Sequence, residues 1–314
     1  MYDFDRPLRI GTRGSRLALA QTHLVADRLK AAFPQLQITI RTIDTSGDWK
    51  KEHGETRLPD NKGGKGLFLK EVEEALISDY IDCGVHSMKD VPSVLDEGLC
   101  VDHVLEREDP RDAFICSSHG CYYSLPEGAV VGTASLRRQA AITRIRPDLD
   151  VTILRGNVDT RLQKVKDGQV DAAVLAAAGL KRLGLEGRVT KYFKPEEMLP
   201  ACGQGVVTIE TIQSHAGVRF LLDSIHHEET GLAVTAERAA LQALEGSCQT
   251  PVGAYATLDE NNQMHLRVCV YEADGSAVYA DEAKATIKTT KEAFDLGFKI
   301  GQKIRPLAPE ELFA

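Results

Sequence analysis

The stretch VGTASLRR, residues 131–138, decides the expected fold. Its first residues are apolar and predict a β-strand, and the residues that follow predict a helix. A glycine and the hydroxyls of Thr133 and Ser135 lie between the two, and Arg137 and Arg138 come directly after them. Backbone N–H groups at a helix start attract anions. The stretch therefore predicts a strand, a turn and a helix that bind a negatively charged group.

A second stretch, LRGNVDTR at residues 154–161, repeats this arrangement. Arg155 ends a predicted strand, and Arg161 lies about one turn into the next predicted helix. Because ligands bind at the carboxyl ends of strands in open α/β sheets, we expect the two stretches to converge on a cleft. Guanidinium groups bind carboxylates and phosphates two bonds at a time, which favours a multiply charged ligand. Pairing of a single arginine with Asp148 or Asp159 stays open as a structural alternative.

The residues around these stretches alternate between strands and helices, which predicts an α/β fold. The predicted strands are 8–11, 36–40, 83–85, 129–131, 151–154, 172–175 and 266–271, and the predicted helices include 135–145, 228–244 and 291–304. Ser15 is positioned to cap a first helix. Residues 106–112 are charged and contain a proline, which indicates a crossover between two α/β units. The residues from 228 onward predict a small α+β domain.

The composition indicates a globular protein without a nucleic-acid surface. The 314 residues are 43% hydrophobic and carry a net charge of -8, whereas nucleic-acid binders usually carry a basic face. Seven cysteines are scattered without C-x-x-C pairs, which favours reduced thiols and no metal site. No apolar run reaches membrane-spanning length, and no apolar leader stands at the N-terminus. We expect a cytoplasmic monomer with no nucleic-acid, membrane or metal partner.

The segment HSMKDVP, residues 86–92, groups a hydroxyl, a cation and a carboxylate after a predicted strand. Asp90 is a candidate active carboxylate, able to stabilise a transient cation or to move a proton. In the structural alternative, Asp90 stabilises the turn before Pro92 and His86 is an ordinary core histidine. Spacing alone leaves both interpretations open.

Cys248 differs from the other six cysteines in its surroundings. It lies in EGSCQTP, residues 245–251, where a long predicted helix ends and a loop begins. An accessible thiol capable of covalent attachment is the functional interpretation, and a structural role is the alternative. The nearest histidine, His265, lies in a predicted strand, so a local Cys-His dyad is not evident.

Two further motifs give no nucleotide or metal site. GGKGLF at residues 63–68 lacks the G-x-x-x-x-G-K-[ST] pattern of a P-loop. HHEE at residues 226–229 lacks the H-E-x-x-H spacing and is better interpreted as capping near a helix start. Residues 201–205 predict a flexible turn, and residues 48–64 a polar loop.

Taken in chain order, these segments resemble the porphobilinogen deaminase family, also called hydroxymethylbilane synthases, which act in tetrapyrrole biosynthesis. The resemblance covers nearly the whole chain. The segments that carry it are 12–15, 63–68, 86–92, 132–138, 154–161, 180–184, 203–205 and 245–253.

The resemblance implies an α/β fold in which two domains of the type II periplasmic-binding-protein kind form a cleft, with a small α+β C-terminal domain. Domain 1 would comprise residues 1–105 and 206–223 and carry the catalytic aspartate. Domain 2, residues 106–205, would carry the arginine-rich site. Domain 3, residues 224–314, would carry the cofactor-attachment cysteine.

The resemblance also implies a transferase that deaminates four porphobilinogen molecules and joins them head to tail on a dipyrromethane cofactor. Cys248 would hold this cofactor through a thioether, and hydroxymethylbilane and ammonia would be released. Asp90 would be the catalytic residue. The cofactor-binding residues would be Ser87, Lys89, Thr133, Ser135, Arg137, Arg138, Arg155, Gly156 and Arg161. The substrate-binding residues would be Arg13, Ser15, Lys65, Phe68, Arg182 and Gln204.

Two rival functions remain at this point. A non-catalytic anion-binding protein of the periplasmic kind would use the same two-lobed architecture, but the absence of an export sequence and the Cys248 loop argue against it. A cysteine hydrolase would need a histidine beside Cys248.

Overall fold

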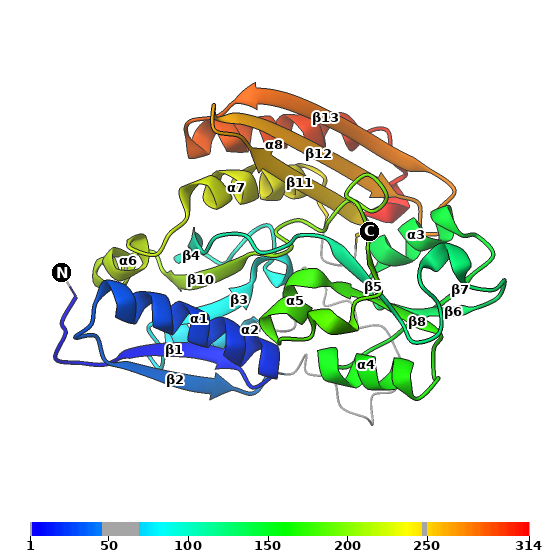
Figure 1. The fold of residues 1–314 in the computed structure, drawn as a ribbon. Helices are drawn as coiled ribbons and strands as arrows, with labels where there is room; N and C mark the ends of the chain where they lie inside the picture. The colour runs from blue at the N-terminus through cyan, green and yellow to red at the C-terminus, as the bar shows by residue number, and fades with distance from the viewer. Residues whose placement is uncertain (1, 46–68, 247–249, 314) are drawn as a thin grey trace. The chain divides into compact units, whose positions relative to one another are not determined.

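The computed structural model describes the chain except for residues 1, 46–68, 247–249 and 314 (Figure 1). The described residues form two compact units. The first unit contains residues 2–45, 69–108 and 206–231, and the second contains residues 109–205 and 232–313. The division into three domains stays a prediction, because the C-terminal sheet falls in the same unit as residues 109–205.

The first unit is built on a five-stranded sheet with the strand order β2-β1-β3-β10-β4. Its strands are β1 (Leu8–Arg13), β2 (Ile38–Ile43), β3 (Cys83–Ser87), β4 (Leu99–Val104) and β10 (Val207–Ile212). Its helices are α1 (Arg16–Ala32), α2 (Lys70–Ile77) and α6 (Ala216–Asp223). β1 pairs in parallel with β2 and β3, whereas β10 runs antiparallel to both of its neighbours. The chain therefore returns to this sheet more than a hundred residues after β4.

Apolar side chains cover both faces of this sheet. On one face, Leu8 of β1 packs with Val25 and Leu29 of α1 and with Leu221 of α6. The second face carries a separate cluster from α2 and the strands beside it, whose members include Val72, Leu76, Ile81 and Leu99. Because successive side chains of a strand point to opposite faces, residues next to each other in β3 belong to different layers.

The second unit contains a sheet of the same size with the strand order β7-β6-β8-β5-β9. Its strands are β5 (Asp112–Cys116), β6 (Val130–Gly132), β7 (Asp150–Thr152), β8 (Ala172–Ala176) and β9 (Lys191–Tyr192). Its helices are α3 (Leu136–Ile145), α4 (Val158–Lys166) and α5 (Ala177–Arg182). β6 pairs in parallel with β7 and β8, and β5 runs antiparallel to β8 and β9.

A three-stranded antiparallel sheet and two helices complete the second unit. They are β11 (Val252–Leu258), β12 (Gln263–Tyr271), β13 (Val278–Thr286), α7 (Glu228–Ala243, which begins at the end of the first unit) and α8 (Thr290–Ile304). Ala236 of α7 and Ile300 of α8 belong to the same buried cluster as Leu266 of β12. At the far end of β12, Cys269 and Tyr271 join the core that surrounds Phe114 of β5.

The predicted fold class is confirmed: the chain has two α/β sheets and a small C-terminal α+β part. Ser15 caps α1 as predicted, and the Nδ1 atom of His227 accepts a hydrogen bond of 3.3 Å from the N–H of Thr230 at the start of α7. The crossover predicted for residues 106–112 is too long by one residue. Asp112 begins β5 and is fully buried. Its negative charge, which suggested a solvent-exposed linker, is neutralised by Arg137 and Arg138.

Candidate active site

The segment Ser87–Asp90 leaves the sheet of the first unit and is held by its own backbone. Directly after β3, one turn of 3₁₀ helix spans Met88–Asp90. The Met88 side chain is buried, and its N–H donates to the carbonyl oxygen of Val206 over 3.0 Å. Lys89 and Asp90 are half-buried. The backbone thus presents the Asp90 carboxyl from a turn that the sheet fixes.

Side chains on both faces of β3 anchor this segment. Gln21 of α1 donates from Nε2 to Oγ of Ser87 over 2.8 Å. On the opposite face, Nε2 of His86 lies 3.0 Å from Oε2 of Glu210 in β10. His86 and Glu210 are 6% and 0% exposed. The structure favours the interpretation of His86 as a core histidine, and neither anchoring partner was found from the sequence.

Arg13 and Ser15 lie at the sheet edge that also carries Asp90. β1 and β3 are parallel neighbours, so their carboxyl ends reach the same edge. β1 ends at Arg13, and Ser15 begins α1 with its Oγ accepting from the N–H of Ala18 over 3.2 Å. The structure therefore brings Arg13, Ser15 and Asp90 to one edge of the first unit, where the Asp90 segment also carries Ser87 and Lys89.

In the second unit, the stretch 131–138 folds as the sequence predicts. Ser135 is the N-cap of α3, and its Oγ accepts from the N–H of Arg138 over 3.4 Å. The N–H of Ser135 donates to Oγ1 of Thr133 over 3.2 Å. Thr133 is buried, and its N–H donates to the carbonyl oxygen of Thr152 over 2.9 Å. Two hydroxyls therefore set the turn that opens α3.

The stretch 154–161 forms the matching turn at the start of α4. Asn157 is the N-cap, and its Oδ1 accepts from the N–H of Thr160 over 2.9 Å. Arg161 donates from Nε to the carbonyl oxygen of Gly156 over 2.8 Å. Arg155 is 7% exposed. Because β6 and β7 are parallel neighbours, α3 and α4 begin at the same edge of this sheet.

Arg137 and Arg138 share one buried carboxylate, that of Asp112. Nη1 of Arg137 lies 2.8 Å from Oδ2 of Asp112, and Nε of Arg138 lies 2.8 Å from Oδ1. The side chains of Arg137 and Asp112 are 3% and 0% exposed. Burial tends to raise the pKa of the Asp112 carboxyl, but the charges of the two arginines outweigh it and hold that pKa well below its usual range. The partner is thus Asp112 and not Asp148, which pairs with Arg146.

Gln204 forms hydrogen bonds with Asp112 and Arg138, and Arg182 forms one with the residue after Gln204. Nε2 of Gln204 donates to Oδ1 of Asp112 over 3.0 Å, and its Oε1 accepts from Nη2 of Arg138 over 3.3 Å. Arg182 donates from Nη2 to the carbonyl oxygen of Gly205 over 2.7 Å. The apolar residues that follow Asp112 in the sequence are a signal for a strand, but they do not reveal which residues its carboxylate pairs with.

Three predicted site residues, Lys65, Phe68 and Cys248, lie outside the described residues. His265, the histidine nearest to Cys248 in the sequence, has its Nε2 atom 3.0 Å from Oε2 of Glu282 on the next strand.

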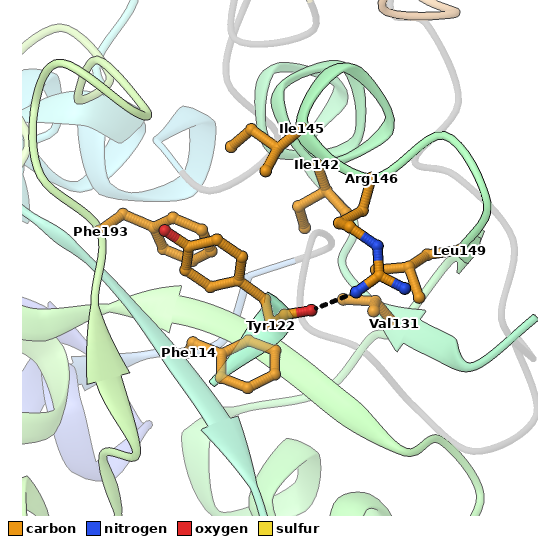
Figure 2. A pocket seen from close by; sticks show the side chains of 8 residues that line it. All are labelled: Phe114, Tyr122, Val131, Ile142, Ile145, Arg146, Leu149 and Phe193. Carbon is orange, nitrogen blue, oxygen red and sulfur yellow. Dashed lines mark hydrogen bonds between the residues drawn. The ribbon is translucent and has the colours of Figure 1, made fainter. Parts of the chain in front are cut away.

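A small apolar pocket lies in the second unit at the opposite end of α3 (Figure 2). The rings of Tyr122 and Phe193 stack at 4.5 Å between centroids and fill one side of it. Arg146 closes the other side, with Nη1 donating to the Tyr122 carbonyl oxygen over 2.7 Å. None of the predicted site residues lines this pocket. It belongs to the packing of the core and not to the candidate site.

Within the described residues, no helix is both long and apolar enough to cross a membrane. The same residues contain no group of three or more histidine, cysteine or carboxylate side chains suited to a metal ion.

Fold and site together define a class: a mixed α/β protein whose second unit has two capped helix starts and a buried arginine pair, and whose first unit carries a carboxylate in a fixed turn. Residues 8–219 match the family model described as "Porphobilinogen deaminase, dipyromethane cofactor binding domain". Residues 231–306 match "Porphobilinogen deaminase, C-terminal domain". The chain belongs to the porphobilinogen deaminase family, whose members polymerise pyrroles in tetrapyrrole synthesis.

Several solved structures are similar to this one at low identity. A periplasmic substrate-binding protein of an ABC transporter from Coxiella burnetii matches with 12% identity, over 74% of this chain and 96% of that chain, with a TM-score of 0.45. The methionine binding protein MetQ matches with 13% identity, over 73% of this chain and 93% of that chain, with a TM-score of 0.45.

The residues of the cofactor-binding domain fit a dipyrromethane. Each pyrrole of this cofactor carries carboxylates, and the second unit offers two capped helix starts at one sheet edge, with Arg155 and Arg161 beside α4. Gly156 has φ near +110°, and a Cβ there would lie 2.7 Å from Cγ2 of Thr160, so the turn accepts only glycine without strain. The donor chemistry and the tight backbone both suit a bound polycarboxylate.

Proposed function

We propose that the protein is a hydroxymethylbilane synthase that deaminates four porphobilinogen molecules and joins them head to tail. The observation that supports this most strongly is the pair of family matches over residues 8–219 and 231–306. Asp90, fixed in its turn by Met88 and Val206, supplies the carboxylate that the reaction needs.

Asp90 acts by electrostatics. Loss of ammonia from porphobilinogen leaves positive charge on the pyrrole, and a preorganised carboxylate stabilises it where it develops. The Asp90 carboxylate accepts a hydrogen bond from the pyrrole N–H while ammonia leaves. Because its segment is held by the sheet, little reorganisation is needed at that moment.

The cationic side chains bind the carboxylates that each pyrrole carries. In the first unit, Arg13 and Ser15 bind the incoming substrate, and Ser87 and Lys89 bind the cofactor. In the second unit, the cofactor contacts are Thr133, Ser135, Arg137, Arg138, Arg155, Gly156 and Arg161. Arg182 contacts the substrate, and Gln204 belongs to the same substrate site. Charged hydrogen bonds of this kind contribute about 1.5–3 kcal/mol each, so a few suffice to orient a pyrrole.

Cys248 is proposed to hold the dipyrromethane through a thioether. When bound, this cofactor supplies the pyrrole carbon on which the chain of pyrroles grows. Lys65 and Phe68 are proposed to contact substrate as well. The three-domain division, with residues 1–105 and 206–223 in domain 1, belongs to the same proposal, as does a monomeric state.

The test combines intact mass with turnover. Wild-type protein, Cys248→Ser and Cys202→Ser are purified in parallel, and their masses and their release of ammonia from porphobilinogen are measured. Cys202 is a half-buried cysteine of the second unit and serves as the matched control. We expect wild type and Cys202→Ser to carry a dipyrromethane adduct and to release ammonia, and Cys248→Ser to do neither.

The outcomes separate the candidate functions. An unmodified thiol in a fully active wild-type sample would contradict the covalent primer. A wild-type protein that binds porphobilinogen without releasing ammonia would be an anion-binding protein and not a synthase. Hydrolysis of a thioester or peptide by Cys248, with no adduct formed, would favour a cysteine hydrolase.

A further inference from the structure

Gln204 is buried and uses its whole amide inside the protein. It is 1% exposed. Nε2 donates to the carbonyl oxygen of Pro110 over 2.7 Å and to Oδ1 of Asp112 over 3.0 Å, and Oε1 accepts from Nη2 of Arg138 over 3.3 Å. An amide whose nitrogen and oxygen both have protein partners, and which solvent hardly reaches, acts on a ligand through its neighbours. Among these neighbours, Arg138 is the residue that also lies at the start of α3.

Arg138 is fixed from several directions at the start of α3. Besides its bond to Gln204, Nε donates to Asp112 over 2.8 Å and Nη1 donates to the carbonyl oxygen of Val174 over 3.2 Å. Its backbone N–H donates to the capping hydroxyl of Ser135. The same residue therefore belongs both to the helix start that attracts anions and to the buried network.

Asp112 sets the charge of this network. Arg137 and Arg138 carry two positive charges and Asp112 carries one negative charge, so the three side chains together present one positive charge. The arginines thereby attract carboxylates less strongly than two free guanidinium groups would. A site that must release a product bearing many carboxylates needs this weaker attraction, because tight binding of every carboxylate would slow release.

We propose that Asp112 and Gln204 are positioning residues for the pyrrole carboxylates: they fix Arg138 at the start of α3 and hold the local charge at one positive. The inference rests on the proposed function and adds to it the groups that balance capture against release. Gln204 thus serves the substrate site through Arg138 and not by direct contact.

The test changes the charge in both directions. Gln204→Glu adds a negative charge to the network, and Asp112→Asn removes one. In the double variant Asp112→Asn/Gln204→Glu the carboxylate and the amide exchange places, so the net charge and the hydrogen bond between the two side chains are kept. Gln169→Glu, at an exposed glutamine of the same unit, is the matched control.

We expect opposite effects from the two single changes. Gln204→Glu should raise the KM for porphobilinogen about tenfold, since one charged hydrogen bond is weakened. Asp112→Asn should lower kcat about tenfold through slow release, with enzyme-bound intermediates accumulating in native mass spectra. The double variant should return towards wild type in KM, in kcat and in Tm, and Gln169→Glu should match wild type.

A merely structural network would give a different pattern. Both single variants would then lower Tm, while KM and kcat of the folded fraction stayed within about twofold of wild type, and this result would overturn the proposal. If one single variant fails to fold, the proposal would also be overturned by a double variant whose KM and kcat are no closer to wild type than those of the remaining single variant. A wild-type protein that turns over no porphobilinogen would instead refute the proposed function.

Discussion

Nε2 of His86 lies 3.0 Å from Oε2 of Glu210. His86 directly precedes the segment Ser87–Asp90. Glu210 is fully buried, and its Oε1 has no hydrogen-bond partner within the described part of the chain. Replacing His86 by alanine would leave a buried carboxylate without its donor. We expect His86→Ala to lower the free energy of unfolding by about 3 kcal/mol, measured by urea denaturation.

The double variant His86→Ala/Glu210→Leu tests the cause of that loss. Removing the carboxylate as well should recover part of the stability, because the uncompensated charge is gone. His23→Ala, at an exposed histidine of α1, should change little. Equal losses in the single and the double variant would show that packing, and not the buried charge, accounts for the effect.

Asp90→Asn should abolish most turnover without unfolding the protein. Asp90 is half-buried at the end of its turn, so the isosteric amide should fit, while the negative charge opposite the developing cation is lost. We expect kcat to fall by a factor of about 10² to 10³, as for other preorganised electrostatic groups. Ammonia release is measured on protein shown by mass to carry the cofactor. Turnover near that of wild type would remove Asp90 from the mechanism.

The sequence allows prediction of the local turns because local chemistry determines them. Ser15 was predicted as a cap because its hydroxyl precedes periodic apolar residues, and it is the N-cap of α1. Ser135 was predicted as the start of a helix, and it is the N-cap of α3. The strand-turn-helix order of residues 131–138 and the turn and helix of residues 154–161 follow from the same signals. These features depend on a few neighbouring residues, so the rest of the fold does not alter them. The strand predicted to end at Arg155 is wrong at its end, because β7 stops at Thr152.

The partners of the site residues could not be predicted, because the fold brings them from distant positions. Asp112 lies 25 residues from Arg137, and Glu210 lies 124 residues from His86. In the sequence, Asp112 stands among charged residues and resembles a solvated linker. Only the antiparallel pairing of β5 with β8 places it inside the sheet. Such long-range pairing leaves no periodic signal in a single sequence.

The carboxylate of Asp82 should determine part of the acid sensitivity of the first unit. Its side chain is fully buried and accepts from Nη2 of Arg6 over 2.9 Å, and from Nε and the backbone N–H of Arg9 over 3.0 and 2.7 Å. Burial tends to raise the Asp82 pKa, but the hydrogen bonds from Arg9 outweigh it and lower that pKa. A lowered folded pKa means that this stabilisation is present above the unfolded value of about 3.9 and is lost as pH falls through the folded pKa.

We therefore expect the Tm of wild type to fall more steeply than that of Asp82→Asn as the pH is lowered from about 5 to about 2. At neutral pH Asp82→Asn should be the less stable protein, and the difference in Tm should shrink as the pH falls. Asp5→Asn, an exposed aspartate of the same unit, should follow wild type. Parallel curves for wild type and Asp82→Asn would show that other groups cause the acid sensitivity.

Gly156→Ala should damage the start of α4 more than an equivalent change elsewhere. Gly156 has φ near +110°, an added Cβ would lie 2.7 Å from Cγ2 of Thr160, and its carbonyl oxygen accepts from Nε of Arg161. Gly168→Ala is the matched control, because φ is near +69° there but nothing lies within 4 Å of the added Cβ. Left-handed strain of about 1–2 kcal/mol should appear in both, and the clash should add about 1–3 kcal/mol in Gly156→Ala alone. Because the clash moves Arg161, only Gly156→Ala should also raise the KM for porphobilinogen. Equal unfolding energies and equal KM values in the two variants would show that this turn does not position Arg161 for the ligand.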